Sequence, residues 1–132
     1  MSNAKQIFIV GSSRSGTTMM GRILGNHADV FTFRELHFFG TIWTNTSNQE
    51  LTRKAQIDLL SRLFCIQADG IFNQDNISDF TSKSEQLISD GLNNSLEIYK
   101  LFLETITKEN SANISCEQTP KNLYYLEEIL QF

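Results

Sequence analysis

Residues 7–18 read IFIVGSSRSGTT, an apolar run that leads into a loop with a glycine at each end and two threonines behind it. A buried strand from Ile7 to Val10 would aim this loop, and Gly11 and Gly16 would let its backbone curl tightly. A helix that begins at the threonines would present unpaired N–H groups to an anion. The sequence therefore predicts a phosphate-binding loop between a first strand and a first helix.

The spacing of the two glycines is the G-x-x-x-x-G of a nucleotide-binding P-loop, but one residue type is missing. Thr17 stands where an ATP or GTP hydrolase carries the lysine that contacts the β- and γ-phosphates. The positive charge lies inside the loop instead, at Arg14. A plain glycine turn between a strand and a helix of any α/β protein remains the alternative interpretation.

Residues 7–18, together with residues 24–30 (LGNHADV), resemble the phosphosulfate-binding loop and first helix of the sulfotransferases that use 3′-phosphoadenosine 5′-phosphosulfate. Members of that family bind this co-substrate without a metal ion. The resemblance implies that backbone N–H groups and hydroxyls of the loop hold the 5′-phosphate, and that Arg14 neutralises charge that develops on the bridging oxygen and the sulfonate. The implied donor-binding residues are Ser13, Arg14, Ser15, Gly16, Thr17 and Thr18.

A second segment, Arg34 to Phe39, follows a short apolar run at residues 30–33. Its Glu-x-His-Phe-Phe pattern is similar to the segment that carries the catalytic base in the heparan sulfate branch of the sulfotransferases. An acceptor hydroxyl has a high pKa, so a nearby carboxylate or imidazole must take its proton as it attacks sulfur. Glu35 is the predicted base, and His37 would assist it, or orient the acceptor or the sulfonate. Alternatively, Glu35 is a first-turn carboxylate and His37 a half-buried ring beside the phenylalanines.

A third segment reads Glu117-Gln118-Thr119-Pro120 and looks like the Glu-Lys-Thr-Pro element of many sulfotransferases. A threonine before a proline also suits a helix N-cap, because the first helical position needs no N–H. The departure is Gln118, which stands where the family commonly has a lysine that helps to stabilise the sulfonate. Lys121 is either its replacement or a solvent-facing side chain.

The fold predicted by this resemblance is an α/β domain with a parallel central sheet flanked by helices, of the P-loop nucleotide hydrolase-like kind, with the donor at the carboxyl ends of the strands. We expect residues 1–132 to be the amino-terminal part of one sulfotransferase domain. Its phosphosulfate loop spans residues 11–18, and a helical insertion at about 40–112 shapes the acceptor pocket. Capping boxes at Ser47–Glu50 and Ser82–Glu85 predict helices over about 48–66 and 83–90. Apolar residues predict a third helix, which fades over 108–113; they are Leu92, Leu96, Tyr99, Leu103 and Ile106.

The length of 132 residues is about half that of a usual sulfotransferase domain. The sequence contains no candidate for the arginine-rich element that holds the 3′-phosphate in this family, and we expect that element beyond Phe132. The chain is therefore predicted to be a fragment. The isolated chain is expected to be weakly active or inactive, although the protein to which it belongs is an enzyme.

The net charge of −4 argues against a basic surface for nucleic acid or heparan-like polymers, because such partners bind clustered lysines and arginines. The acceptor is expected to be a small molecule or a carbohydrate with a hydroxyl or amine. The sequence has no pattern of a signal peptide or of a membrane span, which favours a cytoplasmic protein. Cys65 and Cys116 lack a metal-binding or redox spacing and are predicted to be reduced and buried. A homo-oligomer is left open.

The function predicted from these segments is in-line transfer of a sulfuryl group from 3′-phosphoadenosine 5′-phosphosulfate to an acceptor. Two alternatives remain at this point. One is a P-loop nucleotide kinase or another enzyme that uses a nucleoside triphosphate with Mg²⁺. The other is a non-catalytic nucleotide-binding module, which the neutral Gln118 would fit.

Overall fold

The computed structural model describes residues 5–12, 14–43, 49–89 and 94–131. Three parallel strands form one sheet, in which β3 lies between β1 and β2. Because all three strands run the same way, their carboxyl ends meet at one edge of the sheet. The predicted α/β class with a parallel sheet is confirmed. The strands are β1 (Lys5–Phe8), β2 (Val30–Thr32) and β3 (Ile114–Glu117).

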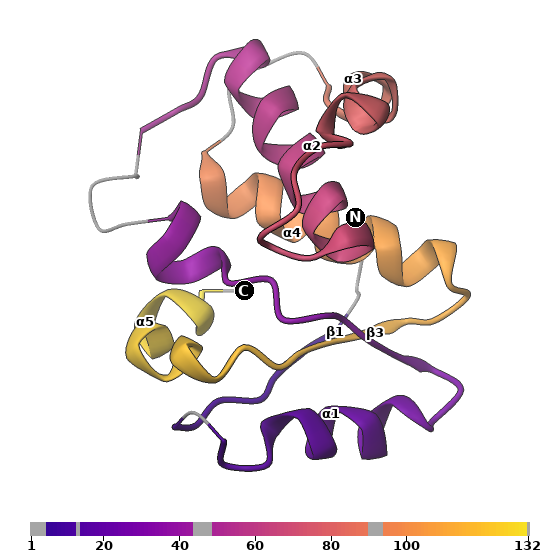
Figure 1. Cartoon of the computed structure of the whole chain (residues 1–132), viewed down its shortest axis with the longest axis vertical. Coiled ribbons are helices and arrows are strands. Elements are labelled where there is room, and N and C mark those ends of the chain that lie inside the picture. Colours follow the sequence, from indigo (N-terminus) through magenta and orange to yellow (C-terminus); the bar gives the residue numbers. More distant parts are fainter. Residues whose placement is uncertain (1–4, 13, 44–48, 90–93, 132) are drawn as a thin grey trace.

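Helices cover both faces of this sheet (Figure 1). Helix α1 (Thr17–Gly25) packs on β2 and β3 from one side, and α4 (Ser95–Glu109) packs on β3 from the other. Helix α2 (Arg53–Asp69) lies on α4, and α3 (Thr81–Leu87) lies on α2. The predicted helical segment between the second and third strands is therefore present and forms the outer layers of the molecule.

Short helical segments complete the chain. A π-helical turn, η1, follows the second strand, and a 3₁₀ segment, η2, precedes α3. Beyond β3 the chain forms a 3₁₀ segment, η3, that begins at the predicted helix start and runs directly into α5. Their bounds are η1 (Phe38–Ile42), η2 (Ile77–Phe80), η3 (Pro120–Tyr125) and α5 (Leu126–Ile129).

Two predicted capping boxes are wrong. Helix α2 begins at Arg53 and not near residue 48, because the Thr52 hydroxyl accepts the N–H of Ala55 and caps the helix there. Ser47 and Asn48 lie outside the described residues. In the second case Ser82 lies inside α3, which begins at Thr81 and has no side-chain cap. The third predicted helix agrees better: α4 ends at Glu109, and Leu92 lies outside the described residues.

An aromatic core fixes the chain just after β2. Phe33, Phe38 and Tyr99 are almost fully buried, and the rings of Phe38 and Tyr99 stack with their centroids 4.1 Å apart. Leu36 is fully buried as well, whereas Arg34 is exposed and Glu35 and His37 are partly exposed. The core therefore holds the segment that carries Glu35 and His37, and leaves those two side chains on its outer side.

Both cysteines are buried and free, as predicted. Burial raises the pKa of the Cys116 thiol above 9.0, so that side chain behaves as a small apolar group. Over the described ranges, no helix combines the length and the apolar character that crossing a membrane requires.

Candidate active site

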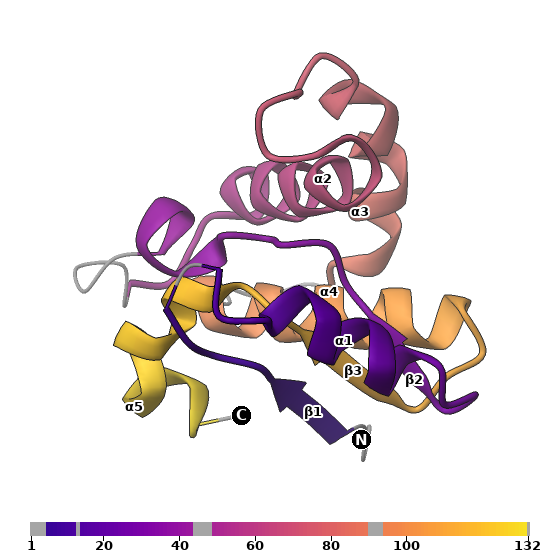
Figure 2. The same ribbon diagram turned by 60° about the horizontal axis from the view of Figure 1, so that its bottom comes forward.

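The carboxyl end of β3 joins the two loops that the sequence marks as functional. The N–H of Gly11 donates to the carbonyl oxygen of Pro120 at 3.2 Å, which ties the phosphate loop to the end of the central strand. On the other side, the side-chain amide of Gln118 donates to the carbonyl oxygen of Phe33 at 3.4 Å. Gln118 also accepts a hydrogen bond from the Thr18 hydroxyl at 3.3 Å. Three segments far apart in sequence thus meet at one edge of the sheet (Figure 2).

The phosphate loop has the backbone of an anion cradle. Arg14 and Gly16 both adopt left-handed conformations, with φ of 61° and 92°. A Cβ on Gly11 would lie 2.6 Å from the Ser15 hydroxyl oxygen, so only glycine fits there without a shift of that side chain. In the described part of the chain, the N–H groups of residues 14–18 have no hydrogen-bond acceptor. These five consecutive donors and a helix amino terminus are therefore free to bind an anion.

The side chains of this loop divide into two groups. Those of Arg14, Ser15 and Thr18 are exposed, and the position of a Cβ on Gly16 has no atom within 4 Å. The side chain of Thr17 is buried. Thr17 therefore offers its N–H to a ligand more readily than its hydroxyl. Ser13 lies outside the described residues.

Glu35 and His37 form a pair on the neighbouring loop. A carboxylate oxygen of Glu35 lies 3.3 Å from Nε2 of His37, and both side chains are about one third exposed. His37 has a left-handed backbone with φ of 53°, which turns the chain into η1 immediately afterwards. The structure thus places a carboxylate and an imidazole next to each other and open to solvent, an arrangement suited to proton transfer.

The sequence analysis missed a buried polar cluster at the end of β3, which we name the Glu117 cluster (Glu117, Thr119 and Asn122). The Glu117 carboxylate accepts hydrogen bonds from the Thr119 hydroxyl, the Asn122 side-chain amide and the N–H groups of Leu36 and Thr119. Each of the three side chains is about 1% exposed. A glutamate at the end of a buried central strand, two residues before Thr-Pro, is the signal that could have revealed it.

Burial sets the protonation behaviour of this cluster. Removal from water raises the pKa of Glu117 from 4.5 to about 7, and the hydrogen bonds from Thr119, Leu36 and Asn122 oppose that rise. Burial also raises the pKa of Tyr99 well above 10.0, and the nearby Glu117 charge adds to this shift. Glu117 therefore titrates near neutral pH in the interior of the protein.

A cavity of about 260 Å³ opens beside His37. It combines aromatic rings with one cationic side chain, because Lys121 lies on its wall. Helices α2, α3 and α4 contribute no lining residue, and Gly40 and Thr41 are the lining residues that the described part of the helical insertion provides. The lining residues are His37, Phe39, Gly40, Thr41, Lys121, Tyr124 and Tyr125.

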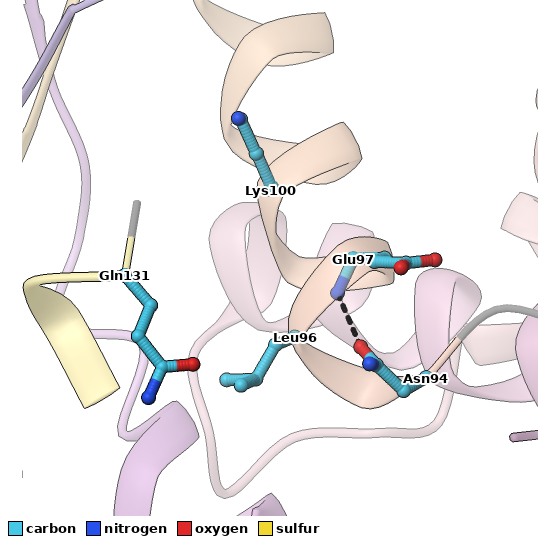
Figure 3. Close-up of a pocket in the computed structure, with 5 residues that line it drawn as sticks. All are labelled: Asn94, Leu96, Glu97, Lys100 and Gln131. Carbon is cyan, nitrogen blue, oxygen red and sulfur yellow. Dashed lines mark hydrogen bonds between the residues drawn. The ribbon is translucent and has the colours of Figure 1, made fainter. Parts of the chain in front are cut away.

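A second pocket of similar volume lies at the amino-terminal end of α4, where the Asn94 side chain accepts the N–H of Glu97 (Figure 3). It shares no lining residue with the cavity beside His37. Among the described residues, no group of three or more histidine, cysteine, aspartate or glutamate side chains is arranged to hold a metal ion. The lining residues of this second pocket are Asn94, Leu96, Glu97, Lys100 and Gln131.

A parallel sheet flanked by helices, whose first strand leads into a glycine-bracketed loop with N–H groups free in the described structure and whose next loop carries the Glu35–His37 pair, defines an α/β protein. A comparison with protein families assigns residues 6–132 to the sulfotransferase family, and the chain belongs to that family. The predicted family is thereby confirmed, and membership supports sulfotransferase activity in general. No curated protein and no solved structure gives a significant match to the chain.

Proposed function

We propose that this protein transfers a sulfuryl group from 3′-phosphoadenosine 5′-phosphosulfate to a hydroxyl or amine of a small acceptor. One observation carries the proposal: the carboxyl end of β3 hydrogen-bonds to the phosphate loop through Pro120 and to the loop of Glu35 through Thr119. A donor held by one loop would therefore present its reactive group toward a base on the other. Family membership supports the same reaction class.

The donor's 5′-phosphate fits the cradle because the N–H groups of residues 14–18 have no acceptor among the described residues. The free Cβ position of Gly16 leaves space beside that backbone, and the positive end of α1 favours an anion. Arg14 stands in the loop with an exposed guanidinium, where it would neutralise charge on the sulfonate and the bridging oxygen. Ser13 remains a predicted contact of the same loop.

The donor supplies an activated sulfuryl group, and the chain supplies the base. Glu35 takes the proton from the acceptor hydroxyl while the acceptor oxygen bonds to sulfur. The bond between sulfur and the bridging oxygen breaks in line, and adenosine 3′,5′-bisphosphate leaves with that electron pair. Because His37 Nε2 lies 3.3 Å from the Glu35 carboxylate, His37 orients Glu35 and shares its proton.

The acceptor enters through the cavity beside His37. Phe39 and Tyr125 stack with their ring centroids 5.4 Å apart, and Tyr124 is mostly exposed at the rim. Flat rings of this kind bind the apolar face of a sugar or an aromatic acceptor. Lys121 adds a positive charge to the same wall, so it takes over part of the charge that the family's lysine would bring at position 118.

Gln118 is the residue that separates this proposal from a non-catalytic module. It is almost fully buried, and its amide bridges Thr18 and Phe33. A neutral bridge keeps the two loops together but brings no charge to the sulfonate. We therefore assign the cationic roles to Arg14 and Lys121.

Calorimetric titration of the full-length protein with adenosine 3′,5′-bisphosphate in EDTA tests the proposal. We expect binding without a metal ion, and release of the same bisphosphate from the phosphosulfate donor when a panel of phenol, sugar, lipid and tyrosine-peptide acceptors is supplied. Binding that requires Mg²⁺ and ATP would point to a kinase. Binding in EDTA without transfer to any acceptor class would point to a non-catalytic module.

A further inference from the structure

The Glu117 cluster lies directly behind the Glu35–His37 pair. The Thr119 hydroxyl oxygen accepts the N–H of Leu36 at 3.1 Å and the N–H of His37 at 3.3 Å. Leu36 directly follows Glu35, and His37 carries the imidazole. One buried hydroxyl therefore holds the backbone of both candidate proton-transfer residues.

The direction of the Thr119 hydroxyl proton depends on Glu117. A hydroxyl has one proton to donate and two lone pairs to accept with. When Glu117 is ionised, the Thr119 proton points to its carboxylate, and both lone pairs remain for Leu36 and His37. When Glu117 is protonated, its own O–H needs an acceptor, and every other group that hydrogen-bonds to it in the described structure is an N–H donor. Protonation therefore competes for the oxygen that holds the loop, unless the Asn122 amide turns its Oδ1, which has no partner among the described residues, toward the carboxyl group.

We propose that Glu117, acting through the Thr119 hydroxyl, is the positioning residue that fixes the Leu36–His37 backbone and so aims Glu35 and His37. The inference rests on the proposed roles of Glu35 and His37. Glu117 and Thr119 of the Glu-x-Thr-Pro element thereby hold the loop that carries Glu35. This role differs from that of Gln118, which bridges the two loops. Asn122 supports it by donating to the second oxygen of Glu117.

The charge state of Glu117 gives the inference a signature in pH. Its pKa of about 7 means that the ionised form, which holds the loop, gains population as the pH rises through neutrality. The ionisable groups around it are Tyr99 on α4 and Cys116 on its own strand, with Glu35 and His37 on the loop and Lys121 on η3. Burial raises the pKa values of Tyr99 and Cys116, so both stay neutral in this range.

The same titration acts on overall stability with the opposite sign. The folded-state pKa of Glu117 lies above the unfolded value, so its contribution to stability is lost as the pH rises through 7. A merely structural role would make the loop follow overall stability and loosen at high pH. A positioning role makes the loop tighten at high pH. The two roles are therefore distinguishable in one experiment.

Hydrogen exchange of individual amides, measured by NMR between pH 6 and 8 and corrected for intrinsic rates, is that experiment. In the full-length wild-type protein, we expect protection of the Leu36 and His37 amides to rise with pH relative to the amides of β3. Thr119→Val should lower their protection by about 10- to 100-fold at high pH, the loss expected when a buried amide loses its acceptor. Glu117→Gln should remove the pH dependence at both amides.

Two matched variants control for general damage to the fold. Thr119→Ser keeps the hydroxyl and should retain wild-type protection. Thr107→Val removes another buried hydroxyl, which bonds to the carbonyl oxygen of Leu103 within α4, and should leave Leu36 and His37 unchanged. Wild-type protection in Thr119→Val, or wild-type pH dependence in Glu117→Gln, would overturn the inference.

Kinetics adds a readout of function. If the protein is a sulfotransferase, Thr119→Val should lower kcat, with the Kd for adenosine 3′,5′-bisphosphate unchanged, because no described residue of the phosphate loop bonds to Thr119. An equal loss of kcat in Thr107→Val would contradict a positioning role. If no acceptor is sulfated by the wild-type protein, the proposed function fails, while the exchange data still decide whether Glu117 holds the loop.

Discussion

The phosphate loop and the Glu117 cluster lie at the same edge of the sheet and are built in opposite ways. In the loop, the side chains of Arg14, Ser15 and Thr18 are exposed and the N–H groups of residues 14–18 have no acceptor in the described structure. In the cluster, three side chains are buried, and four hydrogen bonds reach one carboxylate. The loop leaves N–H donors open to a ligand, whereas the cluster surrounds one buried carboxylate with donors.

The difference separates residues that bind a ligand from residues that position other side chains. Free donors cost little at the surface because water satisfies them until a ligand replaces it. A buried carboxylate is costly unless every lone pair has a partner, so it persists only with a fixed geometry around it. Residues that touch the substrates are therefore expected at exposed positions, and residues that aim them at buried ones.

The largest effect on kcat is expected from Glu35, a partly exposed residue predicted to touch the acceptor. Replacing Glu35 with glutamine removes the base and should lower kcat by about 10² to 10⁴, with donor binding retained. Steady-state sulfation with the best acceptor, together with calorimetry of adenosine 3′,5′-bisphosphate, measures both quantities. Glu85→Gln, an exposed glutamate of α3, is the matched control. Normal turnover in Glu35→Gln would remove Glu35 from the mechanism.

The second-largest loss of kcat is expected from a substitution of Arg14. Arg14→Ala removes the only cation of the loop and should lower kcat by about 10² to 10³, a typical cost of losing one group that stabilises developing charge. The control is Arg22→Ala, an exposed arginine of the last turn of α1 that should leave kcat unchanged. Equal losses in both variants would mean that Arg14 acts through general surface charge.

The Glu117 cluster is tested by the pH dependence of the free energy of unfolding. The pKa of Glu117 rises from 4.5 to about 7 on folding, so the free energy of unfolding of the wild type should fall by ~3 kcal/mol between pH 4 and 8 relative to Glu117→Gln. Urea unfolding of both proteins across this range measures the difference. A difference that does not change with pH would show that Glu117 carries no titration in the folded protein.

The smallest effect is expected at the rim of the acceptor cavity. Lys121→Ala should raise the acceptor KM by about 3- to 10-fold, because an exposed charge contributes about 1 kcal/mol. Lys100→Ala changes an equally exposed lysine in the pocket of Figure 3, away from the cavity beside His37, and should leave KM unchanged. If the two variants behave alike, Lys121 faces solvent and does not contact the acceptor.

Local patterns predicted some elements well and others poorly. The strand before Gly11 and the helix after Gly16 follow from an apolar run and a glycine-bracketed loop, which act over a few residues. The capping boxes at Ser47 and Ser82 failed because such four-residue patterns occur by chance, and Thr52 caps α2 while α3 has no side-chain cap. Thr119 does precede a proline at a helix start, as predicted, but its side chain bonds elsewhere.

The candidate site was predicted in parts and assembled only by the fold. Arg14, Glu35 and Gln118 could each be found from a motif, because each motif is a short stretch with its own residue types. The meeting of the two loops at Gln118 depends on β3 lying between β1 and β2, a strand order that no local pattern encodes. Glu117 was missed because its motif marks the end of a buried strand, but neither the extent of its burial nor its four hydrogen-bond donors can be read from the motif.

The sequence by itself determined the family, the α/β class and the glycine-bracketed loop between β1 and α1, since these rest on residue types at fixed spacings along the chain. Tertiary structure decided that Thr17 turns inward, that Gln118 bridges two loops, and that Glu117 titrates near neutral pH. The physical reason is that burial, proximity and hydrogen-bond partners depend on contacts between residues up to about a hundred positions apart, such as Thr18 with Gln118.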